Sequence, residues 1–548
     1  MRTRLAGYAE RALTAGTLTD VERRDLRDAL RADLDRFERL GTLSSAAMKQ
    51  HDAGAWPLQA SWANPWAPFG GMDEVLEGRT GSDAFTLSAF AGEVESAALN
   101  IINWDSVSHT VRVEVDPLVH EGSDPGNPRG KITLLEVADV PTQMLDTSFD
   151  ALPRMNSGNV LTIPGLDARQ IWFSVDTKGM GRGVSFTYVK LRTLEPEPKT
   201  LYAVLSVNVW PTPLADTNVL RQCNWAYVHN SRLKDYEAEA IADMTAHGTN
   251  VFATSFAPRA TFDESGNLVG EIDFADHDNF VRLYAPHGML LFQQLGALTG
   301  PGGMDGEAYK KAYIPWMRDW VAHLKEMGVG YDGFAMYPVD EPGLNEGLVD
   351  LYLNNAKLTR EADPKVLMYT DPVGRITAEE LQSMVPYVDI WCPNRNGFLL
   401  NTGAEKLKIM QDSGAQMWTY ECDGNAKHQS PLGYYRAQAW LAWHHGLTGI
   451  GFWSYCTSSA DPWYRSAESP DYLMVYQGDG VVSSKRWEAV RDGVEDYAML
   501  HALRDAAARQ RGAHPEAARE AERLLGGGAA AIAQFCGLDA DGTLPGKG

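Results

Sequence analysis

The spacing of apolar residues changes twice along the chain. Residues 19–40 begin with a Thr19/Glu22 capping box and carry apolar side chains at helical spacing among alternating charges, which predicts an amphipathic helix. From 41 to 78 the pattern is irregular, with tryptophans among prolines, and we expect a loop that wraps a domain surface. From 79 to 210 the period is two, in short runs bounded by Gly, Pro, Asn and Asp. These runs predict a β-sandwich.

Beyond residue 219, short apolar runs alternate with longer segments of helical period. Capping boxes at Thr377/Glu380 and Thr402/Glu405 mark the starts of two of these helices. Eight strands that alternate with helices predict a (β/α)₈, or TIM, barrel. The eight runs are Asn224–His229, Asn250–Ser255, Met289–Gln294, Gly333–Tyr337, Val366–Thr370, Val388–Cys392, Met417–Glu421 and Gly449–Tyr455.

The segment Trp210–Asn218 contains two prolines and has no periodicity, so it marks a boundary between domains. We therefore expect four parts in a multidomain chain that combines all-β and α/β architecture. They are a helical and irregular segment at 1–78, a β-sandwich domain at 79–210, a (β/α)₈ barrel at 219–510 and a helical tail at 511–548.

Composition excludes several classes of function. The 548 residues include 49 Lys and Arg against 72 Asp and Glu, a net charge of −23, which disfavours a nonspecific nucleic-acid binder. The sequence has no run of about 18 apolar residues, which is the length that a membrane-spanning helix needs. The first 40 residues lack the pattern of a secretory signal, and the five cysteines are widely spaced, so we expect a reduced, cytoplasmic protein.

Cysteines and histidines give little support for a metal. Cys392, Cys422 and Cys456 follow the ends of the last three strands, so a thiolate cluster is conceivable, but small apolar packing is the more common role. The chain has no HExxH or GxxxxGK[ST] motif. We therefore expect neither a metal nor another cofactor.

Candidate chemistry gathers where the predicted strands end, which is where barrels of this kind place their active sites. Amide, carboxylate and aromatic groups in one mouth suit a sugar, because hydroxyls need hydrogen-bond partners and the C–H face of a sugar packs on a ring. The residues expected to bind substrate are Trp225, Tyr227, His229, Gln294, Asp371, Trp391, Asn394, Trp418, Tyr420, Trp453, Tyr455 and Trp463.

Asp340 and Glu341 are adjacent carboxylates directly after the predicted fourth strand. Mutual repulsion and partial burial would favour the protonated form of at least one, as a proton donor to a glycosidic oxygen requires. Alternatively, Asp340, Glu341 and Pro342 begin a helix, where acids are favoured by the dipole and proline fits the first turn.

Several motifs resemble the family 123 glycoside hydrolases and related uncharacterised domains. They are Trp225-Ala226-Tyr227, Asp340-Glu341-Pro342, Gly449-Ile450-Gly451-Phe452-Trp453 and the segment from Ser484 to Tyr497. The resemblance covers roughly residues 80–505 and implies a β-N-acetylgalactosaminidase-type mechanism that retains configuration. It further implies that Glu341 is the acid and base, and that Asp340 orients the 2-acetamido group of the sugar as the nucleophile.

Glu421, at the end of the predicted seventh strand, leaves a second mechanism open. Many retaining barrel glycosidases place a carboxylate nucleophile there, and Glu341 with Glu421 would then act by double displacement on a sugar without an acetamido group. Glu421 could instead bind a sugar hydroxyl. We expect an exo-acting retaining glycosidase on a neutral glycoside or oligosaccharide. The remaining alternative is a noncatalytic sugar-binding or scaffold protein.

Overall fold

The computed structural model describes most of the chain from residue 56 onward. The described residues are 19, 23–24, 26–27, 30–31, 41–43, 45–48, 56–72, 82–120, 130–294, 297–304, 306–399, 404–422, 426–457, 460–465 and 471–528. Those between 23 and 31 are helical, as predicted for 19–40. Glu22 of the predicted capping box and Thr402 of another lie outside the described residues. The described residues form two compact units, one made of 1–89, 95–136 and 154–211, the other of 90–94, 137–153 and 212–548.

The first unit contains two β-sheets. One has the strand order β1 (Leu58–Ala63), β3 (Val94–Asn103), β10 (Asp167–Asp176) and β6 (Lys131–Glu136). The other has the order β2 (Ala84–Ala91), β12 (Thr200–Pro213), β11 (Gly183–Thr193), β4 (His109–Val115) and β9 (Val160–Ile163), and β5 (Val119–His120) pairs with β11. In β4, Val111 and Val113 are buried and Arg112 and Glu114 are exposed, which confirms the period of two in this strand.

Strand β1 lies inside the segment that the sequence predicts to be irregular. It runs antiparallel to β3 over its whole length, and Trp62 is 2% exposed with its ring 5.1 Å from that of Phe173. Buried and half-buried residues do not alternate in this strand. The expected loop is therefore wrong for Leu58–Ala63. This segment has no sequence period of two, and its pairing with β3 makes it a strand.

In the second unit, eight parallel strands close a barrel, as predicted. Their order is β13 (Arg221–Cys223), β14 (Val251–Thr254), β16 (Met289–Gln293), β18 (Phe334–Tyr337), β19 (Leu367–Thr370), β20 (Ile390–Trp391), β21 (Gln416–Glu421) and β22 (Gly449–Phe452). Only the first strand is displaced from its predicted range. It precedes Asn224–His229 because Arg221 and Gln222, which are polar, hide the strand from a search for apolar runs.

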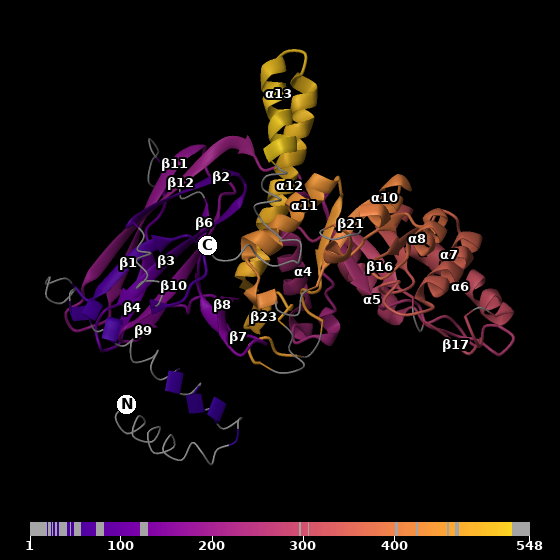
Figure 1. Cartoon of the computed structure of the whole chain (residues 1–548), viewed down its shortest axis with the longest axis horizontal. Coiled ribbons are helices and arrows are strands. Elements are labelled where there is room, and N and C mark those ends of the chain that lie inside the picture. Colours follow the sequence, from indigo (N-terminus) through magenta and orange to yellow (C-terminus); the bar gives the residue numbers. More distant parts are fainter. Residues whose placement is uncertain are drawn as a thin grey trace. The chain divides into compact units, whose positions relative to one another are not determined.

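Helices follow most of the barrel strands. They are α4 (Glu237–Ala246), α5 (Ala275–Tyr284), α6 (Glu307–Glu326), α7 (Leu348–Ala362), α8 (Ala378–Met384), α10 (Ala404–Asp412), α11 (Ala437–His445) and α12 (Lys485–Gln510). The pairs α6–α7, α7–α8 and α8–α10 pack against each other in series (Figure 1). Thr377 caps α8 in a capping box with Glu380, as the sequence predicts.

The barrel interior is filled by side chains from alternate positions of its strands. Tyr337, Tyr369, Trp418 and Tyr420 all belong to this buried cluster. Gly449 of β22 allows the Trp418 ring to lie there, since a β-carbon at residue 449 would lie 2.3 Å from that ring. The same alternation turns the intervening residues of each strand away from the interior.

Residues 137–153 belong to the second unit although they precede it in sequence. They form β7 (Ala138–Pro141) and β8 (Thr147–Leu152), which join β24 (Gly480–Ser484) and β23 (Tyr476–Gly478) in a four-stranded sheet. Asp150 of β8 accepts hydrogen bonds from the buried Arg486 guanidinium at 2.9 and 3.1 Å. Ser484 caps α12 by accepting from the Trp487 N–H. Arg486 and its neighbours in the motif from Ser484 to Tyr497 therefore hold this sheet on α12.

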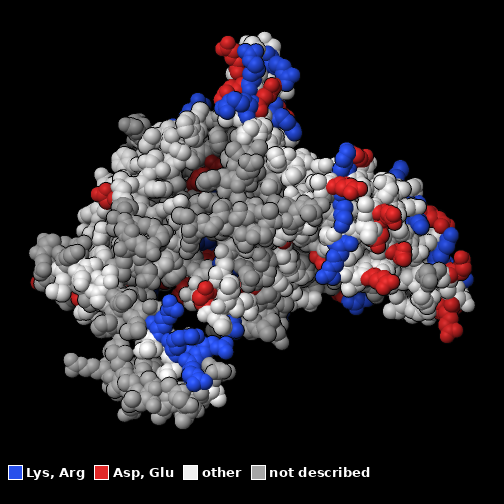
Figure 2. All heavy atoms as spheres, viewed as in Figure 1, with Lys and Arg blue, Asp and Glu red and all other residues white. Residues whose placement is uncertain are grey.

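The end of the described chain is helical, as predicted. Helix α13 (Pro515–Arg523) packs against α12, and residues after 528 lie outside the described part. Acidic and basic side chains are interspersed on α13 and on the barrel helices in Figure 2. None of the helices in the described ranges combines the length and apolar character that crossing a bilayer requires.

Candidate active site

A cavity of about 220 Å³ combines three carboxyl groups, three aromatic rings and a thiol. Its lining residues follow barrel strands β13, β18, β19 and β22 in the chain or lie at the end of β21. They are Trp225, Asp340, Glu341, Asp371, Tyr420, Cys422 and Trp453. All but Cys422 belong to the residues that the sequence predicts for catalysis or substrate binding, so the fold brings six of the fifteen predicted site residues together.

Glu341 is held at both its backbone and its side chain. Its φ of +46° is in the left-handed region, which non-glycine residues occupy rarely. The Glu341 N–H donates to Oδ1 of Asp371 at 3.1 Å, and the Tyr420 hydroxyl donates to Oε1 of Glu341. A residue in this backbone conformation is destabilised by about 1–3 kcal/mol, and the conformation persists only where surrounding contacts enforce it. The contacts of Glu341 therefore fix the position of its carboxylate.

The alternative that the run Asp340-Glu341-Pro342 begins a helix is wrong. Helix α7 starts only at Leu348, and the run forms the loop that leaves β18. Asp340 is exposed and Glu341 is half-buried, while both line the cavity. The two carboxylates are therefore displayed to a ligand.

Asp371 is the buried carboxyl of the cavity, with 2% of its surface exposed. Its Oδ2 lies in hydrogen-bond contact with the hydroxyl of Tyr337, which also contacts Oδ1 of Asp340. Burial, followed by the nearby negative charge of Asp340, raises the pKa of Asp371 well above its usual range. Tyr337 was not among the residues expected to bind substrate, although it shares the inward face of β18 with Ala335.

Aromatic rings form one wall of the cavity. The Trp225 ring centroid is 5.5 Å from that of Tyr420 and 6.4 Å from that of Trp453, and Tyr227 packs on Trp453 at 6.0 Å. The Tyr227 hydroxyl donates to Oε1 of Gln293 at 3.2 Å. Ring faces of this kind suit the C–H surface of a sugar.

Glu421 is placed away from the cavity. Tyr420 points into the barrel, so the alternation of β21 turns Glu421 to the opposite face. There its Oε2 accepts from Nε of Arg395 at 3.3 Å and from the Asn396 N–H at 3.2 Å, and its Oε1 accepts from the Cys422 N–H at 2.9 Å. The side chain is 1% exposed.

Three predicted binding residues, on or just after β20 and β21, make structural contacts within the barrel unit and do not line the cavity. The Trp391 indole N–H donates to Ser413, outside the strands. Trp418 lies within the interior cluster and is 1% exposed. The Asn394 side chain accepts from the Gly397 N–H and caps the short helix α9 (Arg395–Phe398).

Four further predicted residues also do not line the cavity. The side-chain oxygen of Gln294 accepts from the Tyr313 hydroxyl of α6, whereas its neighbour Gln293 faces Tyr227. The Tyr455 hydroxyl donates to Asp243. The His229 ring lies 4.2 Å from that of Phe256 in a tilted contact, and Trp463 packs on Tyr476 of β23.

Within the part of the chain that the structure describes, one group of side chains has the spacing of a metal site: His277, Asp278 and His323. Nε2 of His277 accepts from the Trp320 indole N–H at 2.9 Å, which leaves the proton on Nδ1, facing Asp278 at 3.0 Å. His277 is therefore already satisfied as a packed histidine. Among described residues, Cys392, Cys422 and Cys456 do not form such a group.

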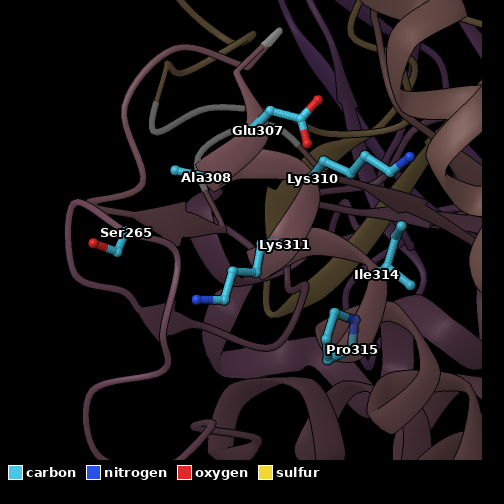
Figure 3. Close-up of a pocket in the computed structure, with 7 residues that line it drawn as sticks. All are labelled: Ser265, Glu307, Ala308, Lys310, Lys311, Ile314 and Pro315. Carbon is cyan, nitrogen blue, oxygen red and sulfur yellow. The ribbon is translucent and has the colours of Figure 1, made fainter.

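A larger hollow of about 620 Å³ lies along α6 (Figure 3). Its lining is Ser265, Glu307, Ala308, Lys310, Lys311, Ile314 and Pro315. Lys311 donates to Asn267, and Lys310 pairs with Glu361. The hollow contains neither a carboxylate pair nor an aromatic wall, so the smaller cavity is the candidate active site.

Comparison with known proteins bears on this cavity. Residues 302–503 match the family model "Glycoside hydrolase 123, catalytic domain". The matched stretch contains both Asp340 and Glu341. This match confirms the resemblance for the three motifs that it contains, and Trp225-Ala226-Tyr227 lies before it. None of the curated proteins matches the chain.

Among solved structures, a family 123 glycoside hydrolase from Clostridium perfringens, described for glycolipid glycan hydrolysis, shares the fold. It has a TM-score of 0.66 and 12% identity, with 87% of this chain and 98% of that chain covered. A GH2 β-galacturonidase from Eisenbergiella tayi has a TM-score of 0.33 and 10% identity over 73% of this chain and 69% of that one. An endo-1,4-β-mannanase from Rhizomucor miehei gives 0.35 and 12% over 57% and 97%.

Proposed function

We infer that the chain is a glycoside hydrolase with a family 123 catalytic domain at residues 302–503. We propose that it is an exo-acting, retaining enzyme whose nucleophile is the 2-acetamido group of its own substrate. The observation that carries this proposal is the placement of Asp340 and Glu341 in one cavity while Glu421 faces the other side of β21. A volume of about 220 Å³ is small for a ligand site and suits one sugar ring better than a chain.

In the proposed reaction Glu341 donates its proton to the glycosidic oxygen as the bond to the anomeric carbon breaks. Asp340 accepts a hydrogen bond from the acetamido N–H, which directs the acetamido oxygen to the anomeric carbon and forms an oxazolinium ion. Glu341, now a carboxylate, removes a proton from water as the water oxygen attacks the anomeric carbon. The oxazolinium ring opens in this step and the acetamido group is restored. Two inversions give net retention.

The double-displacement alternative needs a carboxylate nucleophile within the cavity. Glu421 pairs with the buried Arg395 and accepts three hydrogen bonds, so reaching a sugar would require it to leave a buried cation unpaired. Breaking a buried pair in this way costs about 3–5 kcal/mol. We therefore propose that Glu421 supports the seventh strand and takes no direct part in the chemistry.

The scaffold alternative predicts no turnover, and the site argues against it. Glu341 keeps a costly left-handed backbone, and its carboxylate is positioned by Tyr420 in an open cavity. A protein without catalysis has no need to maintain either feature.

We also propose that the two sheets of the first unit pack as the sandwich expected at residues 79–210. Support comes from the buried face that each sheet presents, with Val111 and Val113 on one and Ile171 and Phe173 on the other. The cytoplasmic location is retained as a proposal from the sequence. So are the four parts, except that residues 137–153 belong to the second unit and β1 belongs to a sheet of the first unit.

Hydrolysis of aryl 2-acetamido-2-deoxy glycosides compared with the matching 2-hydroxy glycosides tests the reaction. We expect activity on the 2-acetamido set alone, with retention of configuration in the first-formed product seen by NMR. Activity confined to the 2-hydroxy set would contradict substrate assistance, and inactivity on a wide panel of both would favour the scaffold. Asp340→Asn, prepared in parallel, shows whether any activity comes from this cavity.

A further inference from the structure

Three side chains at the cavity are connected through one phenol. The Tyr337 hydroxyl is in hydrogen-bond contact with Oδ1 of Asp340 and with Oδ2 of Asp371. The other oxygen of Asp371, Oδ1, accepts from the Glu341 N–H at 3.1 Å. Asp371 thus touches both members of the proposed catalytic pair, one through Tyr337 and the other through the backbone.

Counting protons shows that two carboxylates cannot both be charged here. A tyrosine hydroxyl has one proton to donate, so it can satisfy a single carboxylate, and the second contact must then be donated to the phenol oxygen. A carboxyl group donates only when it is protonated. The three groups therefore share two protons, one on Tyr337 and one on an aspartic acid.

Burial decides which aspartic acid holds the proton. Asp340 is exposed at the rim, whereas Asp371 is 2% exposed. A charge is far more costly at the buried position. The groups that act most strongly on the Asp371 carboxyl besides burial are Asp340, Tyr337 and Glu341, and none of them is a cation.

The other titratable groups that act on or respond to Asp371 across the barrel are also neutral when protonated. They are Cys223, Tyr227, Tyr352, Tyr369, Cys392 and Tyr420. Burial raises the pKa of the Cys223 thiol to about 12, so it does not supply a charge near pH 7.

We propose that Asp371 is a positioning residue that works as a neutral carboxylic acid: it donates to Tyr337, Tyr337 donates to Asp340, and its second oxygen holds the Glu341 backbone. The chain of donors leaves Asp340 as the anion of the trio, with Oδ1 occupied and Oδ2 presented to a ligand. This inference rests on the proposed function, because it assigns Asp340 the task of orienting an acetamido group.

Two substitutions of Asp371 separate this role from that of a charged ligand-binding residue. Asp371→Asn keeps an N–H that can donate to Tyr337 and an oxygen that can accept from Glu341, whereas Asp371→Ala keeps neither. We expect Asp371→Asn to retain kcat within about fivefold of wild type and Asp371→Ala to lose about a hundredfold in kcat with little change in KM, as misplacement of a reacting group does. Equal losses in the two variants would overturn the proposal.

An infrared measurement tests the protonation state without using activity. We expect the wild-type minus Asp371→Asn difference spectrum at neutral pH to show the C=O band of a protonated carboxyl, and the wild-type minus Asp340→Asn spectrum to lack it. No such band in the first spectrum, or its appearance in the second, would overturn the inference. Wild-type enzyme that fails to hydrolyse 2-acetamido glycosides would instead contradict the proposed function, and the infrared result would still decide the state of Asp371.

Discussion

Nε of Arg395 lies 3.3 Å from Oε2 of Glu421, and neither side chain has more than 1% of its surface exposed. Arg395 also donates to the Tyr434 carbonyl and to Gln438, and it packs on the Tyr434 ring. This relationship gives Glu421 a structural task and separates it from the cavity that contains Asp340 and Glu341.

Glu421→Gln should lower stability and leave turnover within a few-fold of wild type. Loss of one partner from a buried ion pair destabilises proteins by about 3–5 kcal/mol, and the double variant with Arg395→Gln should recover part of that loss. Thermal denaturation and kcat on the folded fraction provide the two readouts. A 2-fluoro glycoside that labels Glu421, seen by peptide mass spectrometry, would show that this residue is a nucleophile.

Glu341→Gln should act according to the leaving group of the substrate. Removal of a general acid slows cleavage by about 10²–10⁴-fold where the departing oxygen must be protonated. Activated aryl glycosides, whose departure needs little protonation, should be slowed much less. Turnover plotted against leaving-group pKa for wild type and variant gives the measurement, and a uniform loss across the series would contradict the role as acid.

Asp340→Asn should weaken catalysis more than binding of substrate. The amide keeps the shape of the side chain but removes the charge that would stabilise the oxazolinium ion. We expect a fall in kcat of about 10²–10³-fold with KM changed only a few-fold. A thiazoline mimic of the cyclic intermediate should also bind the variant more weakly, and calorimetry measures this. Unchanged kcat would remove Asp340 from the mechanism.

Tyr420→Phe should reduce kcat by about tenfold, because Glu341 loses the hydroxyl that holds Oε1 while the ring still packs on Trp225. Tyr455→Phe is the matched control, since its hydroxyl binds Asp243 away from the cavity. The control should lower the melting temperature without changing kcat. If both variants lose turnover equally, the Tyr420 hydroxyl has no special part in positioning Glu341.

Asp371 should also leave a signature in the pH dependence of stability. Its pKa is raised above the usual 3.8, so above that pH the folded protein keeps a proton that the unfolded chain releases. Stability attributable to this group is complete below the unfolded pKa and falls as pH rises, by about 1.4 kcal/mol per unit, until the folded pKa is passed. As pH rises from about 5 to 8, the melting temperature of wild type should therefore fall relative to that of Asp371→Asn, which has no carboxyl group at this position. Parallel curves would show that Asp371 is ionised in the folded state.

The pattern of apolar runs is sufficient to predict the barrel, because all of its strands but β13 lie within short, mostly apolar segments. It also located Asp340, Glu341 and Asp371, which follow such segments directly. Strand β13 was displaced because Arg221 and Gln222 interrupt the apolar pattern. Strand β1 was missed because the partner that stabilises it is β3, across the sheet.

The direction of each side chain at the mouth was harder to predict than its position. Trp391 and Glu421 stand at strand ends, yet the pairing of their strands turns them outward, and one residue of register separates Glu421 from the inward Tyr420. Tyr337 gained a role only when β19 brought Asp371 next to its hydroxyl. A contact of that kind depends on tertiary geometry that no local sequence pattern contains.

The strands β7 and β8 set an order of events during synthesis. Leu152 of β8 pairs with Ser483 of β24, and Asp150 neutralises the buried Arg486. At roughly 10 residues per second, the ribosome needs about half a minute to make the more than 300 residues that separate these partners. Throughout that interval the edge of β8 is without β24, so a chaperone that shields nascent strands should increase the yield of this protein more than that of a barrel encoded without interruption.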